Sequence, residues 1–166
     1  MKRRVVVTGL GGITPLSRVA CLDIKEDWKR LVQAAVGIRA LPSTEHDPLW
    51  KQLPSKVAAN VPFQDDSSLF TATEHKMMSR GMKLGLVASG SALSDARLLS
   101  KEDIPDPDRS GVAVGTAMVD LDYIGICHKL VQEGSYKKVG PYFVPRILPN
   151  LAPGQAFFIK KKLISK

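Results

Sequence analysis

The chain has 166 residues, 44% hydrophobic and 24% charged, which fits one globular domain or part of a larger one. No run approaches the roughly eighteen apolar residues of a membrane-spanning helix, and no targeting segment is visible at the start, so we expect no membrane span and no secretory signal. The formal charge of +8 arises at the ends, because seven of the 24 basic residues lie in 2–4 and 160–166 and the other 17 nearly balance the 16 acidic residues, which argues against a nucleic-acid-binding face.

The first fifty residues predict a strand, a turn and a helix. Three consecutive valines in 5–8 are typical of a short buried strand, and the glycines of 9–12 predict a tight turn after it. Asp23 predicts the N-cap of a helix that ends at Gly37. Trp28 falls at helical spacing with other apolar residues of this helix, so we expect it in the core.

Residues 38–70 are rich in Pro, Ser and Asp and predict an excursion from the core, with a short extended run at 57–61. Thr71 and Glu74 form a capping-box pattern, and a long, largely buried helix is expected over 76–97. Small side chains on this helix should let a neighbouring backbone approach closely; they are Gly81, Gly85, Ala88, Ser89, Ala92 and Ala96.

Beyond the long helix, residues 104–107 predict a loop and 111–115 a second buried strand. A further helix is expected over 120–133, ended by Gly134. Because strands alternate with helices, the pattern indicates a layered α/β fold.

Gly9-x-Gly11 after a predicted strand invites a nucleotide-binding hypothesis. The third glycine of that fingerprint should stand at position 14, which is Thr14, and Pro15 follows where the phosphate-binding helix should begin. We therefore expect a turn that binds no ligand, and we keep a nucleotide-binding enzyme only as a third hypothesis.

Catalytic and metal-binding alternatives rest on few residues. Cys127 and His128 are adjacent on a predicted helix, where neighbours point in different directions, so Cys127 is interpreted as a buried structural thiol. Cys21 lies before the predicted N-cap and has no nearby histidine. His46 and His75 show no ligand-like spacing and are expected to be exposed, so we predict no metal and no cofactor. The two cysteines form no CxxC pair and suggest no disulfide scaffold, so we expect a reducing compartment.

Five segments carry motifs of one family in the same order and spacing. They are 5–16, 28–38, 78–83, 111–118 and 139–148, the last reading Val-Gly-Pro-Tyr-Phe-Val-Pro-Arg-Ile-Leu. Together they resemble β-ketoacyl-[acyl-carrier-protein] synthases of the elongating, decarboxylating I/II type, whose Ser-Pro-Phe-Phe-Val-Pro segment the last one matches. The sequence of this last segment looks more like the mitochondrial branch of the family than the bacterial one. A mitochondrial location is therefore preferred over a cytoplasmic one.

The resemblance implies a thiolase-like α/β fold, of which this chain supplies an incomplete first half with a mixed sheet covered by helices. Residues 1–155 would form that half, and 156–166 a divergent basic tail. The family also implies a homodimer and acyl carrier protein as a partner, without a cofactor.

The family reaction implies a division of roles. A cysteine thiolate takes an acyl group, malonyl-carrier loses CO₂, and two histidines assist in forming the 3-oxoacyl product. By the resemblance these three residues lie beyond the last matched motif, and neither Cys21 nor Cys127 aligns with the nucleophile. We therefore expect no catalytic residue and no activity from this chain alone. Met118 and Phe143 are the residues expected to border the acyl-chain pocket.

Some positions depart from the family pattern. Ser17 stands where glycine is usual, and Pro149 and Pro153 should perturb a short helix. The tail lacks the Gly-Pro turn that leads to the nucleophile, which predicts a truncated or alternative ending. An incomplete half should expose sheet edges and apolar surface, so poor solubility is expected. The alternative function is a non-catalytic partner that binds a full-length synthase or acyl carrier protein.

Overall fold

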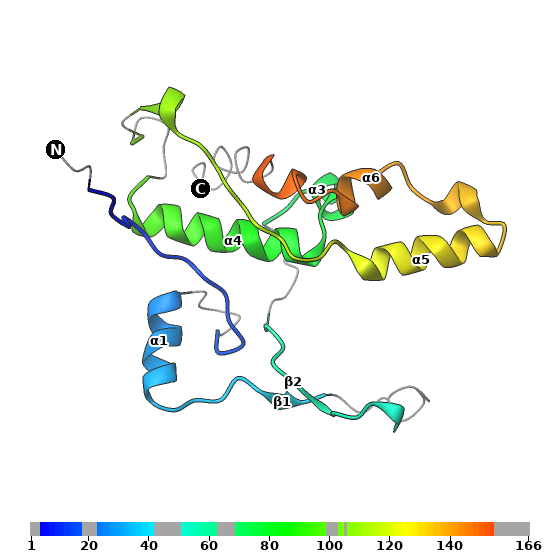
Figure 1. The fold of residues 1–166 in the computed structure, drawn as a ribbon, viewed down its shortest axis with the longest axis horizontal. Coiled ribbons are helices and arrows are strands. Elements are labelled where there is room, and N and C mark those ends of the chain that lie inside the picture. Colours follow the sequence, from blue (N-terminus) through cyan, green and yellow to red (C-terminus); the bar gives the residue numbers. More distant parts are fainter. Residues whose placement is uncertain are drawn as a thin grey trace.

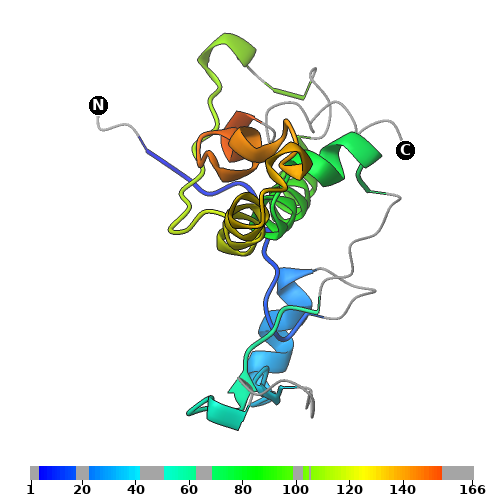
Figure 2. The ribbon, with the colours of Figure 1, turned by 90° about the vertical axis from the view of Figure 1, so that its right-hand side faces the viewer.

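The computed structural model describes residues 4–17, 23–41, 51–62, 69–98, 103–104 and 106–154. Its elements are α1 (Ile24–Val32), β1 (Arg39–Ala40), β2 (Val57–Ala58), α3 (Ala72–Met77), α4 (Arg80–Asp95), the 3₁₀ turn η1 (Pro107–Arg109), α5 (Leu121–Gln132), the 3₁₀ turn η2 (Tyr136–Lys138) and α6 (Phe143–Ile147). Helices α4 and α5 form the long axis with α3 and α6 beside them, and α1 with the two strands projects to one side (Figure 1, Figure 2). Cys21, His46, Trp50 and the tail 156–166 lie outside the described residues.

Helix α1 begins where the sequence predicts and ends earlier. The Asp23 carboxylate accepts a hydrogen bond from the Lys25 backbone N–H, which confirms the predicted N-cap. The helix ends at Val32 and not near Gly37, because Ala34 adopts a left-handed conformation with φ of 58° that breaks the helical hydrogen-bond ladder.

The two predicted buried strands are absent. Residues 5–8 and 111–115 have no strand pairing, and Val5 is 95% exposed. Among the described residues the sheet is limited to β1 and β2, which pair antiparallel with Arg39 opposite Ala58. The strands predicted at 5–8 and 111–115 were therefore wrong, because a strand forms only where a second backbone is in register to exchange hydrogen bonds.

The long helix predicted over 76–97 is two helices. The Thr71–Glu74 capping box is confirmed at the start of α3. The chain then breaks at Met78, whose backbone is extended, and the Ser79 hydroxyl caps α4 by accepting from the Met82 N–H. A serine that competes for backbone donors favours such a break over a continuous helix.

A small core lies at the junction of α3 and α4. Phe70, Met78 and Leu86 are its buried members. Partly buried residues pack against them; these are Val61, Met82, Leu84 and Val87. Burial of such side chains supplies most of the folding free energy, so this junction is the main apolar core of the described residues.

The N-terminal segment crosses α4 at close range. A Cβ atom at Gly9 would lie 2.3 Å from the Ala92 carbonyl oxygen, and one at Gly11 would lie 2.1 Å from the Ala88 carbonyl oxygen. This confirms that small residues on the helix admit a neighbouring backbone. The predicted turn at 9–12 was wrong, since the chain runs on there and turns at 15–16.

Helix α5 agrees with its prediction. Asp120 caps its start by accepting from the Tyr123 N–H, and Gly134, with φ of 71°, lies just beyond its end. Cys127 is 5% exposed within it, which confirms the interpretation as a buried structural thiol.

Much apolar surface stays in contact with solvent. The accessible surface of the chain is 12557 Å², against about 8,100 Å² for a compact monomer of this mass. Trp28, predicted in the core, is 64% exposed, so that prediction was wrong. The surface is therefore larger and more apolar than that of a self-contained domain.

Candidate functional site

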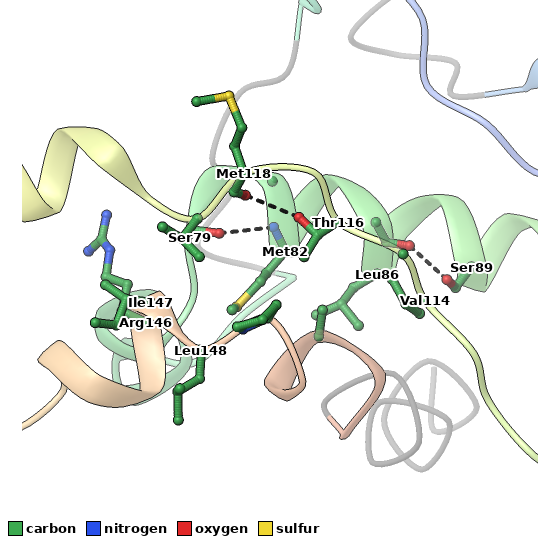
Figure 3. Close-up of a pocket in the computed structure, with 16 residues that line it drawn as sticks. Ser79, Met82, Leu86, Ser89, Val114, Thr116, Met118, Arg146, Ile147 and Leu148 are labelled. Carbon is green, nitrogen blue, oxygen red and sulfur yellow. Dashed lines mark hydrogen bonds between the residues drawn. The ribbon is translucent and has the colours of Figure 1, made fainter.

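An apolar cavity of about 150 Å³ lies between α4, the segment 114–119 and the end of α6. Met82 and Leu86 line it from α4, and Leu148 and Ala152 close the opposite side. Met118, one of the two predicted site residues, is among the lining residues, but it is 66% exposed and its side chain points away from Met82, Leu86 and Leu148 (Figure 3). Apolar cavities of this size accept a ligand of roughly benzene size.

The cavity follows the axis of α4. Its α4 wall extends from Ser79 to Ser89, a rise of about 15 Å at 1.5 Å per residue. Arg146 lies near the Ser79 end, and Val114 lies near Ser89 at the other end (Figure 3). The space is therefore elongated and suits a linear apolar group better than a compact one.

Hydroxyl groups on the walls already have hydrogen-bond partners. Ser79 caps α4, and the Ser89 hydroxyl donates to the Gly85 carbonyl at 2.7 Å. Thr116 donates its hydroxyl hydrogen to the Met118 carbonyl at 3.1 Å. Because these polar groups bond to the backbone, they add little demand for a polar ligand.

A charged network lies at the end of the cavity near Ser79 and contributes Arg146 to its wall. The Arg146 Nε donates to the Asp120 carboxylate, and the guanidinium carbon lies 4.3 Å from the centre of the Tyr123 ring. Burial raises the pKa of Tyr123 above its usual value. The network ties the start of α5 to α6.

The wall carries no group suited to covalent or acid–base chemistry. The lining side chains among the described residues include neither a cysteine, a histidine nor a carboxylate. Their arrangement can bind and orient an apolar chain but cannot supply a nucleophile or a proton.

Phe143, the second predicted site residue, lies outside this wall. Its half-buried ring packs against Tyr123, with 6.1 Å between the ring centres. The structure therefore places Met118 at the cavity and Phe143 behind the network at its end, and does not bring the two together in one wall.

Sequence reasoning missed Arg146 and its partner. The two residues are 26 positions apart, and no local pattern links an arginine after a proline to a helix-capping aspartate. The Phe-Val-Pro-Arg segment was noted only for its similarity to the family motif. The tertiary contact was needed to show that Arg146 pairs with Asp120.

His75 differs from its expected exposure. It is half-buried, its ring meets Phe70 edge-on at 5.8 Å between centres, and its Nδ1 lies 3.0 Å from the Lys83 Nζ. The Cys127–His128 pair is also split, since Cys127 is buried and His128 is exposed. Neither histidine faces the cavity.

The Gly9–Gly12 segment is occupied by protein contacts. The Leu10 N–H donates to the Asp95 carboxylate at 3.0 Å, and Lys25 pairs with the same carboxylate. These partners, the Lys25 hydrogen bond first, hold the pKa of Asp95 below its usual value. An acid at the position that a phosphate would need argues against nucleotide binding.

The part of the chain that the structure describes holds neither a metal-ligand cluster nor a membrane-spanning helix. There, no group of three or more His, Cys, Asp or Glu side chains gathers as metal ligands. No helix of these residues is long and apolar enough to cross a membrane.

Residues 2–158 match the family model described as the beta-ketoacyl synthase N-terminal domain. The chain is 33% identical to the mitochondrial 3-oxoacyl-[acyl-carrier-protein] synthase of Arabidopsis thaliana, covering 92% of this chain and 35% of the relative. It is also 33% identical to the 3-oxoacyl-[acyl-carrier-protein] synthase homolog of Saccharomyces cerevisiae, covering 93% and 38%. The chain thus spans little more than a third of the length of these relatives.

Solved structures give the same fold. A beta-ketoacyl synthase from Burkholderia phymatum superposes with a TM-score of 0.71 at 23% identity, over 96% of this chain and 37% of that chain. A type II polyketide ketosynthase in complex with its acyl-carrier protein gives 0.68 at 24% identity, over 97% and 41%. These likenesses show the thiolase-like fold of the synthases, in part. Because the family model spans nearly the whole chain, the chain belongs to the beta-ketoacyl synthase family and carries its N-terminal domain.

Proposed function

We propose that this chain is the N-terminal part of a 3-oxoacyl-[acyl-carrier-protein] synthase of fatty acid biosynthesis, and that its cavity holds the alkyl chain of the acyl substrate. The observation that carries the proposal is the elongated apolar cavity beside Met118, built without any reactive group. In the decarboxylating condensation the alkyl chain does not react, so its subsite needs only apolar walls.

We also propose that these 166 residues catalyse no condensation by themselves. The reaction needs a thiolate and two imidazoles, which the family resemblance places beyond residue 166. Cys127 does not substitute, because it is buried within α5 and no described histidine approaches the cavity. Incubation with acyl- and malonyl-carrier protein should therefore give no 3-oxoacyl product, and turnover by this chain would refute this proposal.

Binding tests the cavity directly. Isothermal titration with the hexanoyl thioester of N-acetylcysteamine should show one site, and Val114→Asp should weaken that site about tenfold by placing a charge in the apolar wall. Val112→Asp is the matched control, since Val112 is also partly exposed on the same segment but lies outside this cavity. Equal losses in both variants would mean that binding is non-specific.

Phe143 is proposed to border the acyl pocket from a dimer interface. Its neighbours on α5 and α6 expose apolar side chains, among them Leu121, Ile126 and Val144. Such a surface favours association with a second copy of the domain. Light scattering after gel filtration should give twice the chain mass, and a concentration-independent monomer would count against the homodimer.

A second candidate function is a non-catalytic partner of a full-length synthase or an acyl carrier protein. Lys137 and Lys138 are exposed in η2, and further lysines lie in 160–166, so an acidic carrier protein could meet positive charge. A related ketosynthase was solved with its acyl-carrier protein. Pull-down of carrier protein should weaken from low to high salt, whereas salt-independent capture would contradict a charge-driven contact.

A mitochondrial location is proposed on the same comparison. The Arabidopsis relative is a mitochondrial enzyme by name, and the 139–148 wording resembles that branch. Cell fractionation with an antibody against this chain should place it with mitochondrial matrix markers, and recovery with cytosolic markers alone would refute this location.

A further inference from the structure

The cavity has two unlike ends. At the Ser89 end the wall is Val114 and the helix backbone, with nothing charged among the lining residues. At the Ser79 end the wall includes Arg146, the one charged residue of the lining that the structure describes. A linear apolar group placed along α4 therefore meets a charge at one end only.

The charge at that end is held in place from two sides. Asp120 and Arg146 form an ion pair whose side chains are 10% and 26% exposed, respectively. The Tyr123 ring covers the guanidinium, and Asp120 is fixed because its other oxygen caps α5. Arg146 therefore lines the cavity with its stem while its head is turned to α5 (Figure 3).

From this geometry we infer that the Asp120–Arg146 ion pair is the end-stop of the cavity and limits the length of the alkyl chain that it accepts. The inference rests on the proposed function and adds a specificity determinant to it. A longer chain would have to displace the pair or desolvate it, and separating a half-buried ion pair leaves each charge without its partner. The pair thus acts as a barrier to longer chains while leaving short ones unaffected.

The decisive variant removes both charges and shortens the side chain at the end of the cavity. Asp120→Asn preserves the side-chain oxygen that caps α5, and Arg146→Met preserves an unbranched apolar stem. Combining them avoids an unpaired buried charge, which either change alone would leave. Lys129→Met with Glu133→Gln is the matched control, because it removes an exposed ion pair from the same helix, outside the cavity wall.

Binding of hexanoyl and octanoyl thioesters of N-acetylcysteamine is measured for wild type, the double variant and its control. We expect wild type and control to prefer the hexanoyl ligand. The double variant should bind the octanoyl ligand about tenfold tighter than wild type does and the hexanoyl ligand within twofold, since the two extra methylenes now enter the space that the guanidinium occupied.

The outcomes separate the two proposals. An unchanged ratio of the two affinities in a folded double variant overturns the end-stop while leaving the acyl subsite intact. Absence of binding by both ligands to every protein overturns the acyl subsite and the end-stop with it. Where circular dichroism shows that the double variant is unfolded, Asp120→Asn with Arg146→Leu, which also removes both charges, takes its place and should shift the same ratio in the same direction.

Discussion

Two glycine-bearing segments cross α4, and they make opposite use of their glycines. In the first, Gly9 and Gly11 lie so close to the helix that a Cβ atom would overlap its backbone. In the second, Gly111 and Gly115 have open space where a Cβ would be placed. The first crossing is therefore set by close packing, whereas the second stands off from the helix and leaves the cavity beneath it.

The contrast shows that similar sequence patterns can have different physical causes. Both segments are runs of glycine and valine that predict buried strands. In the first segment the glycines lie against small residues of α4. In the second segment the glycines have no neighbour where a Cβ would be placed. Against α4, the described cavity lies under the second segment, because a backbone in contact with a helix leaves no room for a ligand.

Both segments cross α4, so weakening the packing of this helix should have the largest effect on the stability of the chain. Leu86 is 2% exposed in the core of α4, so Leu86→Ala should lower the free energy of unfolding by about 2–5 kcal/mol. Urea unfolding followed by circular dichroism measures this. Val112→Ala, at an exposed position of the second segment, is the control and should change stability by less than about 0.5 kcal/mol. Equal effects would mean that the core does not hold the crossings.

Gly11→Ala tests the first crossing. Its Cβ would overlap the Ala88 carbonyl oxygen, which is backbone and cannot move aside alone, so stability should fall by about 1–3 kcal/mol. Gly111→Ala in the second crossing should be neutral or slightly stabilising, because it has space and reduces unfolded-state entropy. The same urea experiment compares them, and a harmless Gly11→Ala would disprove close packing.

Asp95→Asn should loosen the polar anchor of the first crossing, with a pH signature. The pKa of Asp95 is lowered in the folded state, so its contribution is complete above its unfolded pKa and lost as the pH falls through the folded pKa. The urea midpoint of the variant should therefore lie below that of wild type at pH 6 and merge with it as the pH falls below the folded pKa of Asp95. Asp122→Asn, an exposed acid on α5, is the control. A gap that persists in acid would rule out the charge as its cause.

The smallest effect is expected in the second crossing. The Thr116 hydroxyl bonds to the Met118 carbonyl at an exposed position, so Thr116→Val should change stability by less than about 0.5 kcal/mol. Thr116 lines the cavity, but its hydroxyl already bonds to the backbone. Its replacement should therefore also leave hexanoyl thioester binding within twofold. A larger loss in either titration or unfolding would show that this segment is held as firmly as the first.

Local signals predicted the helix starts well. Asp23 and the Thr71–Glu74 pair cap helices as expected, because a cap depends on residues within one turn of each other. Helix ends were less predictable, since Ala34 ends α1 ahead of the expected Gly37. The family resemblance was confirmed by the match over residues 2–158, which no single motif could establish.

The sequence by itself determined the family, the caps, the burial of Cys127 and the presence of small residues on α4. Tertiary structure alone decided what each apolar segment packs against, because burial depends on which distant backbone arrives beside it. It left residues 5–8 without strand pairing and Trp28 in solvent, and it brought Arg146 to Asp120 across 26 residues. The cavity, too, was decided by the tertiary structure, since its walls come from three segments that share no local pattern.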